Sequence, residues 1–95
     1  ILIHCDSADA QAAERLLNRL KMQLRKTLPD GIDLIGPLPS PLARRAGKFR
    51  FQLTLMAAHA KTLTQETTRI IQVLEQVPNN PTTRLSVDVD PHEFI

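Results

Sequence analysis

The sequence contains no tryptophan and no tyrosine, and only three of its 95 residues are phenylalanine. Proteins that hold single-stranded nucleic acids without sequence preference stack bases on aromatic side chains, so base stacking is disfavoured here. The one cysteine, Cys5, cannot form a disulfide within the chain, which predicts a reducing, cytoplasmic location. Because the cysteine and the three histidines lack the spacing of metal ligands, no metal site is predicted.

The chain also lacks long apolar runs. None approaches the roughly 20 residues that a membrane-spanning helix requires, and no segment resembles a secretion signal. Apolar residues make up 42% and charged residues 23% of the chain, which is typical of a folded globular protein and disfavours disorder. We therefore expect residues 1–95 to form one domain. Because Ile1 already lies in an apolar, strand-like segment, we expect this domain to be part of a longer protein.

Hydrophobic periodicity predicts four strands and two helices. Alternation with a period of two predicts strands at residues 1–5, 32–35, 48–56 and 84–90. Apolar stripes at steps of three and four predict helices at residues 8–28 and 59–77. The order β-α-β-β-α-β is that of the ferredoxin-like α+β fold, in which right-handed crossovers place both helices on one face of a four-stranded sheet.

Particular residues indicate where these elements begin and end. Either Asp6 or Ser7 is expected to be the N-cap of the first helix. Three prolines within residues 36–42 favour an extended segment without ladder hydrogen bonds. Residues 44–47 then suit a turn, in which Gly47 is free to adopt a positive φ.

The alternation also assigns residues to the two faces of the sheet. Phe49 and Phe51 share a face with other apolar residues of the third expected strand, so we expect both rings in the core. Arg50 lies between them and is expected on the opposite, open face. Cys5 falls on the apolar face of the first strand, where a buried thiol is inert rather than catalytic.

Basic residues gather in one part of the chain. The net charge is only +2, yet residues 36–50 hold four cations and no acid. Such a patch attracts phosphates or acidic peptides, and the N–H groups at the start of the second helix are a further anion-binding element. The predicted DNA- or partner-binding residues are Arg44, Arg45, Lys48, Arg50 and Lys61. The alternative interpretation is a solvated, charged loop without a partner.

No catalytic residues are predicted. Asp88 and Asp90 lie roughly 7 Å apart on one strand face, as paired carboxylates would in an acid–base or metal site. No further oxygen ligands lie near them in the sequence, and such acids also keep an outer strand soluble. The alternative interpretation, an enzyme or metabolite-binding domain, would require a histidine to join these carboxylates in one pocket.

Three stretches resemble the C-terminal domain of the PriA family of replication-restart helicases (primosomal protein N′). Residues 34–44, LIGPLPSPLAR, resemble its proline-rich stretch, and residues 48–53, KFRFQL, resemble its basic–aromatic–Arg–aromatic–Gln–Leu strand. Residues 85–91, LSVDVDP, resemble its closing VDVDP motif. Where the family often has Tyr or Trp on this third strand, the chain has Phe49 and Phe51.

The resemblance implies a non-catalytic C-terminal domain of an ATP-driven DNA helicase of the bacterial cytoplasm. The domain would contribute to binding single-stranded or forked DNA through the backbone. It would also help to dock the acidic C-terminal tail of single-stranded DNA-binding protein and contact other domains of the parent. The resemblance implies ATP, magnesium and zinc for the parent alone, and no cofactor for this chain. The alternative is a pure protein-docking domain without DNA affinity.

Overall fold

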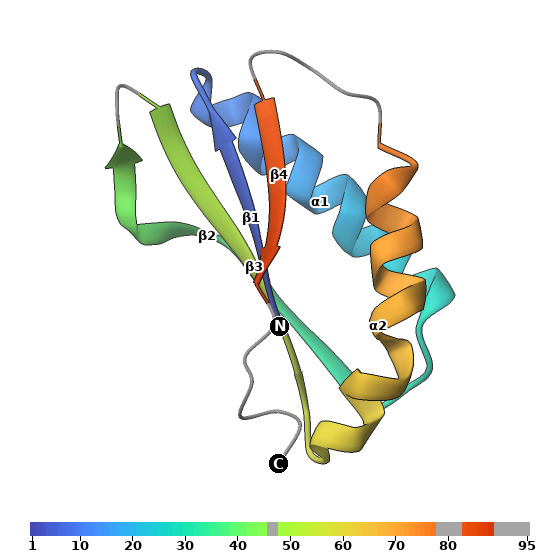
Figure 1. Cartoon of the computed structure of the whole chain (residues 1–95). Helices are drawn as coiled ribbons and strands as arrows, with labels where there is room; N and C mark the ends of the chain where they lie inside the picture. The colour runs from blue at the N-terminus through green and yellow to red at the C-terminus, as the bar shows by residue number, and fades with distance from the viewer. Residues whose placement is uncertain (46–47, 78–82, 89–95) are drawn as a thin grey trace.

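The computed structural model describes residues 1–45, 48–77 and 83–88, with the backbone alone described for residues 41–45. The elements, drawn in Figure 1, are β1 (Leu2–Ser7), α1 (Ala10–Thr27), β2 (Ile32–Arg45), β3 (Lys48–Ala57), α2 (Ala60–Glu75) and β4 (Thr83–Asp88). The four strands form one antiparallel sheet in the order β2-β3-β1-β4. β3 is inserted between β1 and β2, and β1 between β3 and β4, so the predicted ferredoxin-like fold is confirmed.

The first helix begins later than its sequence predicts. The N-cap is Asp9, whose Oδ1 accepts a hydrogen bond from the Gln11 N–H at 3.0 Å, so the prediction of Asp6 or Ser7 was wrong. β1 continues through both of those residues because they pair with β3 and with β4. Ser7 instead accepts a hydrogen bond from the Asp9 N–H at 3.1 Å through its Oγ.

β2 is an edge strand, and it is much longer than expected. It spans 14 residues and runs through the proline-rich segment, with register shifts between Ile35 and Leu38 and between Pro39 and Arg44. An edge strand has a partner on one side only, so prolines that lack an N–H are tolerated there, and the shifts absorb the unpaired residues. The predicted turn at residues 44–47 was therefore wrong for Arg44 and Arg45, which pair with Phe49 and Lys48.

The glycine within β2 is required by a close approach of two backbones. Gly36 has a φ of 114°, and a Cβ at this position would lie 2.8 Å from the Gln52 carbonyl oxygen. Its own carbonyl accepts a hydrogen bond of 2.7 Å from Lys21 Nζ, which ties β2 to α1.

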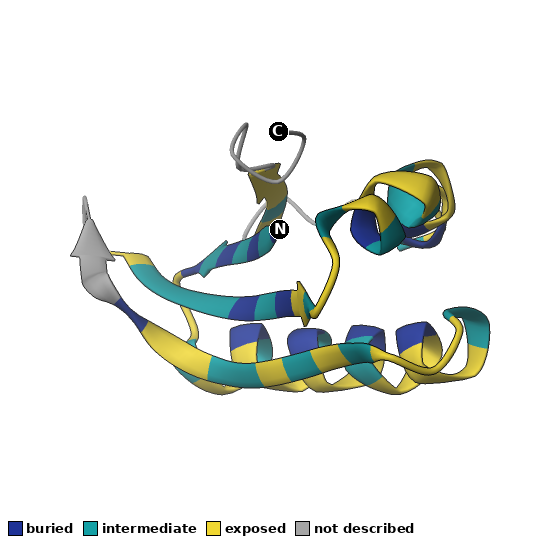
Figure 2. Ribbon diagram, turned by 90° about the horizontal axis from the view of Figure 1, so that it is seen from below, coloured by how far each residue is buried: buried dark blue, intermediate teal, exposed yellow. Residues whose placement is uncertain are grey.

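The core lies between one face of the sheet and the two helices (Figure 2). Its buried apolar residues are Ile1, Ile3, Cys5, Ala13, Leu17, Leu20, Leu24, Leu53, Leu55, Leu63, Ile70 and Val73. α1 packs across β1, β2 and β3, whereas α2 packs on β3 and α1. Phe51 packs against this core as predicted, and Phe49 is half-buried. Among the residues that the structure describes, no helix is both long and apolar enough to cross a membrane.

Candidate anion-binding surface

The open face of the sheet is the face that carries no helix. Directly paired residues of neighbouring strands project to the same face, so the register places one set of side chains there. These residues are Asp33, Ile35 and Leu38 from β2, Lys48, Arg50, Gln52, Thr54 and Met56 from β3, Leu2, His4 and Asp6 from β1, and Arg84, Ser86 and Asp88 from β4.

Four of the five predicted binding residues lie at one end of the sheet. Lys48 is exposed at the start of β3, and the register pairs it with Arg45 at the end of β2. Arg44 pairs in the same way with Phe49, and Arg50 follows two residues after Lys48 on β3. The end of β2 and the start of β3 therefore bring the backbone positions of Arg44 and Arg45 beside those of Phe49 and Lys48.

The fifth predicted residue, Lys61, lies at the other end of the molecule. It is exposed in the first turn of α2, which follows the end of β3 at Ala57. Because a strand rises about 3.3 Å per residue, the ten residues of β3 place Lys61 far from Lys48, and Figure 1 shows the two ends well apart. The structure does not bring Lys61 to the hairpin cations.

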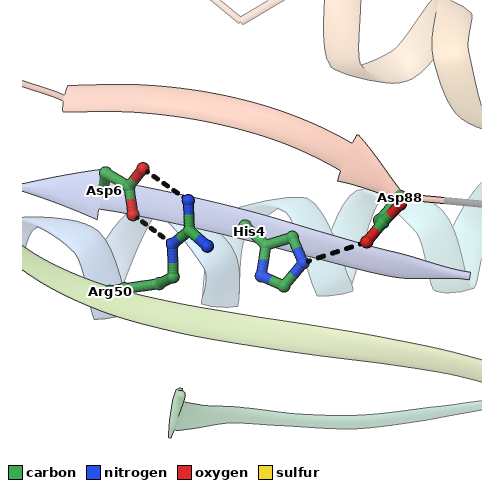
Figure 3. Close-up of polar contacts among 4 residues, drawn as sticks. All are labelled: His4, Asp6, Arg50 and Asp88. Carbon is green, nitrogen blue, oxygen red and sulfur yellow. Dashed lines mark hydrogen bonds and ion pairs between the residues drawn. The ribbon is translucent and has the colours of Figure 1, made fainter. Parts of the chain in front are cut away.

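Arg50 is held by a carboxylate that the sequence did not single out (Figure 3). Its Nε donates to Asp6 Oδ1 at 2.7 Å and its Nη2 donates to Asp6 Oδ2 at 3.1 Å. Both side chains keep about a quarter of their exposure, so this two-point pair is partly shielded from water. The hydrogen bonds from Arg50 hold the pKa of Asp6 below its ordinary value, and Asp6 raises the pKa of Arg50. Arg50 is therefore largely neutralised within the chain.

Arg84 is a cation of the open face that the prediction of the site omitted. The register pairs Asp6 with Arg84 on β4 and with Arg50 on β3, so the carboxylate lies between two arginines. Arg84 is exposed, and no acid within the described residues forms an ion pair with it. The strand order of the ferredoxin-like fold makes β1 the neighbour of both β3 and β4. That order could have predicted Arg84 as a residue of the same surface as Asp6 and Arg50.

His4 and Asp88 form the second polar contact on this face (Figure 3). His4 Nε2 lies 4.0 Å from Asp88 Oδ2, and the carboxylate side chain is 75% exposed. Within the described ranges, no group of three or more His, Cys, Asp or Glu residues could hold a metal ion, and Asp90 lies outside those ranges. A single His–Asp contact of this length, with an exposed carboxylate, does not support the metal or acid–base interpretation of the last strand.

The part of the open face nearest the β2 edge carries three exposed apolar side chains, beside the exposed Asp33 that pairs with Met56. Ile35, Leu38 and Met56 are 44%, 53% and 53% exposed. The described residues of this face include no aromatic ring, because Phe51 faces the core. Of the three, Leu38 lies nearest the hairpin end because it pairs with Gln52, whereas Ile35 and Met56 lie towards the other end of β3.

Comparison with known proteins finds similarity along nearly the whole chain. Residues 1–92 match the family model described as "Primosomal protein N C-terminal domain". The chain is 32% identical over 93 residues to the replication restart protein PriA of Haemophilus influenzae (strain ATCC 51907 / DSM 11121 / KW20 / Rd). The aligned part covers 98% of this chain and 12% of that relative, so the chain spans a small fraction of the relative's length.

Proposed function

The chain belongs to the primosomal protein N C-terminal domain family, and on that premise we propose that it is a non-catalytic DNA- and partner-binding domain of a replication-restart helicase. It contributes to the binding of single-stranded or forked DNA through the phosphate backbone. It also docks the acidic C-terminal tail of single-stranded DNA-binding protein. ATP binding and hydrolysis belong to the rest of the parent, which acts in the bacterial cytoplasm.

The observation that carries the proposal is the gathering of cations at the β2–β3 hairpin. Arg45 pairs with Lys48 in register, and Arg44, the preceding residue of the same strand, pairs with Phe49. Cations that meet phosphates give affinity without sequence preference, and that affinity falls steeply as salt rises. The absence of aromatic rings among the described residues of the open face favours phosphate contacts over base stacking.

DNA binding is tested by neutralising two hairpin cations. Arg44→Gln with Arg45→Gln removes two positive charges, and Gln65→Glu with Gln72→Glu on the exposed face of α2 is the matched control, because it lowers the net charge equally. Fluorescence anisotropy with a labelled oligothymidine across a salt series measures the affinity. The hairpin variant is expected to lose affinity and to reduce the salt slope by about 1.4, since each single-strand phosphate contact contributes roughly 0.7. Equal affinities for the hairpin variant and the control variant contradict the proposal.

A pure docking domain without DNA affinity is the second candidate function. Two observations favour it: Asp6 neutralises Arg50, and the exposed Ile35, Leu38 and Met56 supply an apolar area for an aromatic side chain. An acidic peptide that ends in phenylalanine needs cations for its carboxylates and such an area for its ring. In a titration followed by NMR, this candidate predicts local shifts on adding the peptide and none on adding the oligonucleotide.

A further inference from the structure

The positive charge of the chain is concentrated in one helix. The 18 residues of α1 hold five of the 12 Lys and Arg residues and one of the 10 Asp and Glu residues. This helix therefore carries a formal charge of +4, whereas the whole chain carries +2. Of these five cations, Lys21 donates a hydrogen bond to the Gly36 carbonyl, and the other four are exposed.

Three of these cations form a stripe along the solvent side of α1. Arg15, Arg19 and Lys26 are separated by four and by seven residues, so they lie on one face of the helix. Met22, the most exposed large apolar residue of the described chain at 63%, lies among them. The buried Leu17 and Leu24 lie on the opposite side, and Figure 2 shows α1 with its buried side against the rest of the molecule and its exposed side facing away.

Local helix energetics do not account for this stripe. Arg25 and Lys26 are in the last turn, where the helix dipole favours cations, but Arg15 and Arg19 are not. Arg15 and Arg19 are four residues apart, a spacing at which like charges repel. The only acid of α1, Glu14, has no cation three or four residues away in the helix. Within the described residues, none of the exposed α1 cations forms an ion pair. The helix thus tolerates repulsion that a bound polyanion would relieve.

The stripe is separate from the hairpin cations. The core residues of α1 pack on the face of the sheet that carries Ile3 and Leu53, whereas Arg50 lies on the opposite face. One molecule therefore presents cations on both sides of its sheet. Contact with one of these surfaces leaves the other one accessible.

The shape and composition of the stripe favour a duplex as its partner. A helix is convex and offers no groove for a single strand, and α1 contains no aromatic residue on which bases could stack. The stripe is straight and spans about 16 Å from Arg15 to Lys26, at 1.5 Å per residue. A duplex carries a higher density of charge along its axis than a single strand, and its backbone is bound by cations alone.

We propose that the solvent face of α1, through Arg15, Arg19 and Lys26, binds the backbone of duplex DNA independently of the hairpin surface. This inference rests on the proposed function and extends it, because one domain would then hold a duplex arm on α1 and a single strand at the hairpin. The binding would be independent of sequence and strongly dependent on salt.

The test uses the 95-residue chain, a labelled duplex and a labelled single strand. Arg15→Gln with Arg19→Gln is expected to weaken duplex binding about tenfold at low salt and to reduce the duplex salt slope by about 1.8, since each duplex phosphate contact contributes roughly 0.9. Single-strand affinity is expected to stay within the change seen for the Gln65→Glu, Gln72→Glu control. Arg19→Gln with Lys26→Gln is a second pair, with the same expected loss, and circular dichroism verifies the fold of each variant.

Several results would overturn the inference. These are duplex affinity equal to that of the control variant, a loss on the single strand instead of the duplex, and no duplex binding by the unaltered chain. If the unaltered chain still binds the single strand and loses this binding in the Arg44→Gln, Arg45→Gln variant, the proposed function stands while the α1 inference fails. If the unaltered chain binds neither DNA, both fail.

Discussion

At the scale of the residue, the contact that most changes the interpretation of the surface is the one between Asp6 and Arg50. Arg50 was predicted to bind an anion, and its guanidinium already binds one from within the chain at 2.7 and 3.1 Å. The two residues are 44 positions apart in the sequence. Only the strand register joins them, which is why the alternation of residues predicted the face of Arg50 but not its partner.

Asp6→Asn is expected to lower the free energy of unfolding at pH 7 by about 1–2 kcal/mol, because a charge-assisted pair is replaced by a weaker contact. Arg50 lowers the pKa of Asp6 in the folded state. The stabilisation is therefore complete above the unfolded pKa of about 3.9 and is lost as the pH falls through the folded pKa. Urea denaturation at several pH values measures both effects.

The control for this experiment is Asp33→Asn, because Asp33 is an exposed residue of β2. It should leave the unfolding free energy nearly unchanged at pH 7. An Asp6→Asn variant that is as stable as the control at pH 7, or that loses the same stability as the original chain on acidification, contradicts the role of the pair.

Cys5 is expected to be inert towards thiol reagents in the folded protein. Its side chain is fully buried, and burial followed by the charge of Asp6 raises its pKa to about 11, so almost no thiolate exists at neutral pH. The rate of modification by an aromatic disulfide reagent, measured with and without denaturant, tests this. Fast modification without denaturant would mean that β1 opens or that Cys5 is not in the core.

At the scale of the element, β2 shows which part of a strand a local sequence pattern can predict. Alternation predicted a strand that ends at Ile35, since the prolines that follow were expected to prevent pairing. The strand continues to Arg45 because it lies at an edge and because Gly36 lets its backbone approach that of β3. Both conditions depend on the neighbouring strand, so a local pattern could not supply them. The helices were predicted to within a few residues, since their apolar stripes are local.

Gly36→Ala is expected to destabilise the protein by about 2 kcal/mol or more, because it combines a positive φ with a clash against backbone. Gly31→Ala is the matched control: Gly31 also has a positive φ, of 99°, but no atom lies within 4 Å of its added Cβ. The control substitution should lower the free energy of unfolding by only about 1 kcal/mol. Thermal unfolding of both variants gives the comparison, and equal losses would show that the contact with the Gln52 carbonyl is unimportant.

At the scale of the whole molecule, the sheet separates surfaces of different character. The hairpin end holds the basic positions of β2 and β3, the β2 edge exposes Ile35 and Leu38, and α1 presents a basic stripe on the other side. The order of elements and the handedness of crossovers were enough to predict the topology. They were not enough to place Lys61, since the direction of β3 puts the start of α2 far from the hairpin. The structure thus places Lys48 and Arg50 at the hairpin end of the sheet and Lys61 at the other end, and the binding role of all five predicted residues stays a prediction.

The most direct test of the account is an NMR titration of the 95-residue chain with a single-stranded oligonucleotide at low salt. The largest amide shifts are expected at Lys48 and the strand residues beside it. Amides near Lys61 and along α1 should move little. Shifts that are largest at the start of α2, or that spread evenly over the molecule, would contradict the claim that the β2–β3 hairpin binds the DNA backbone.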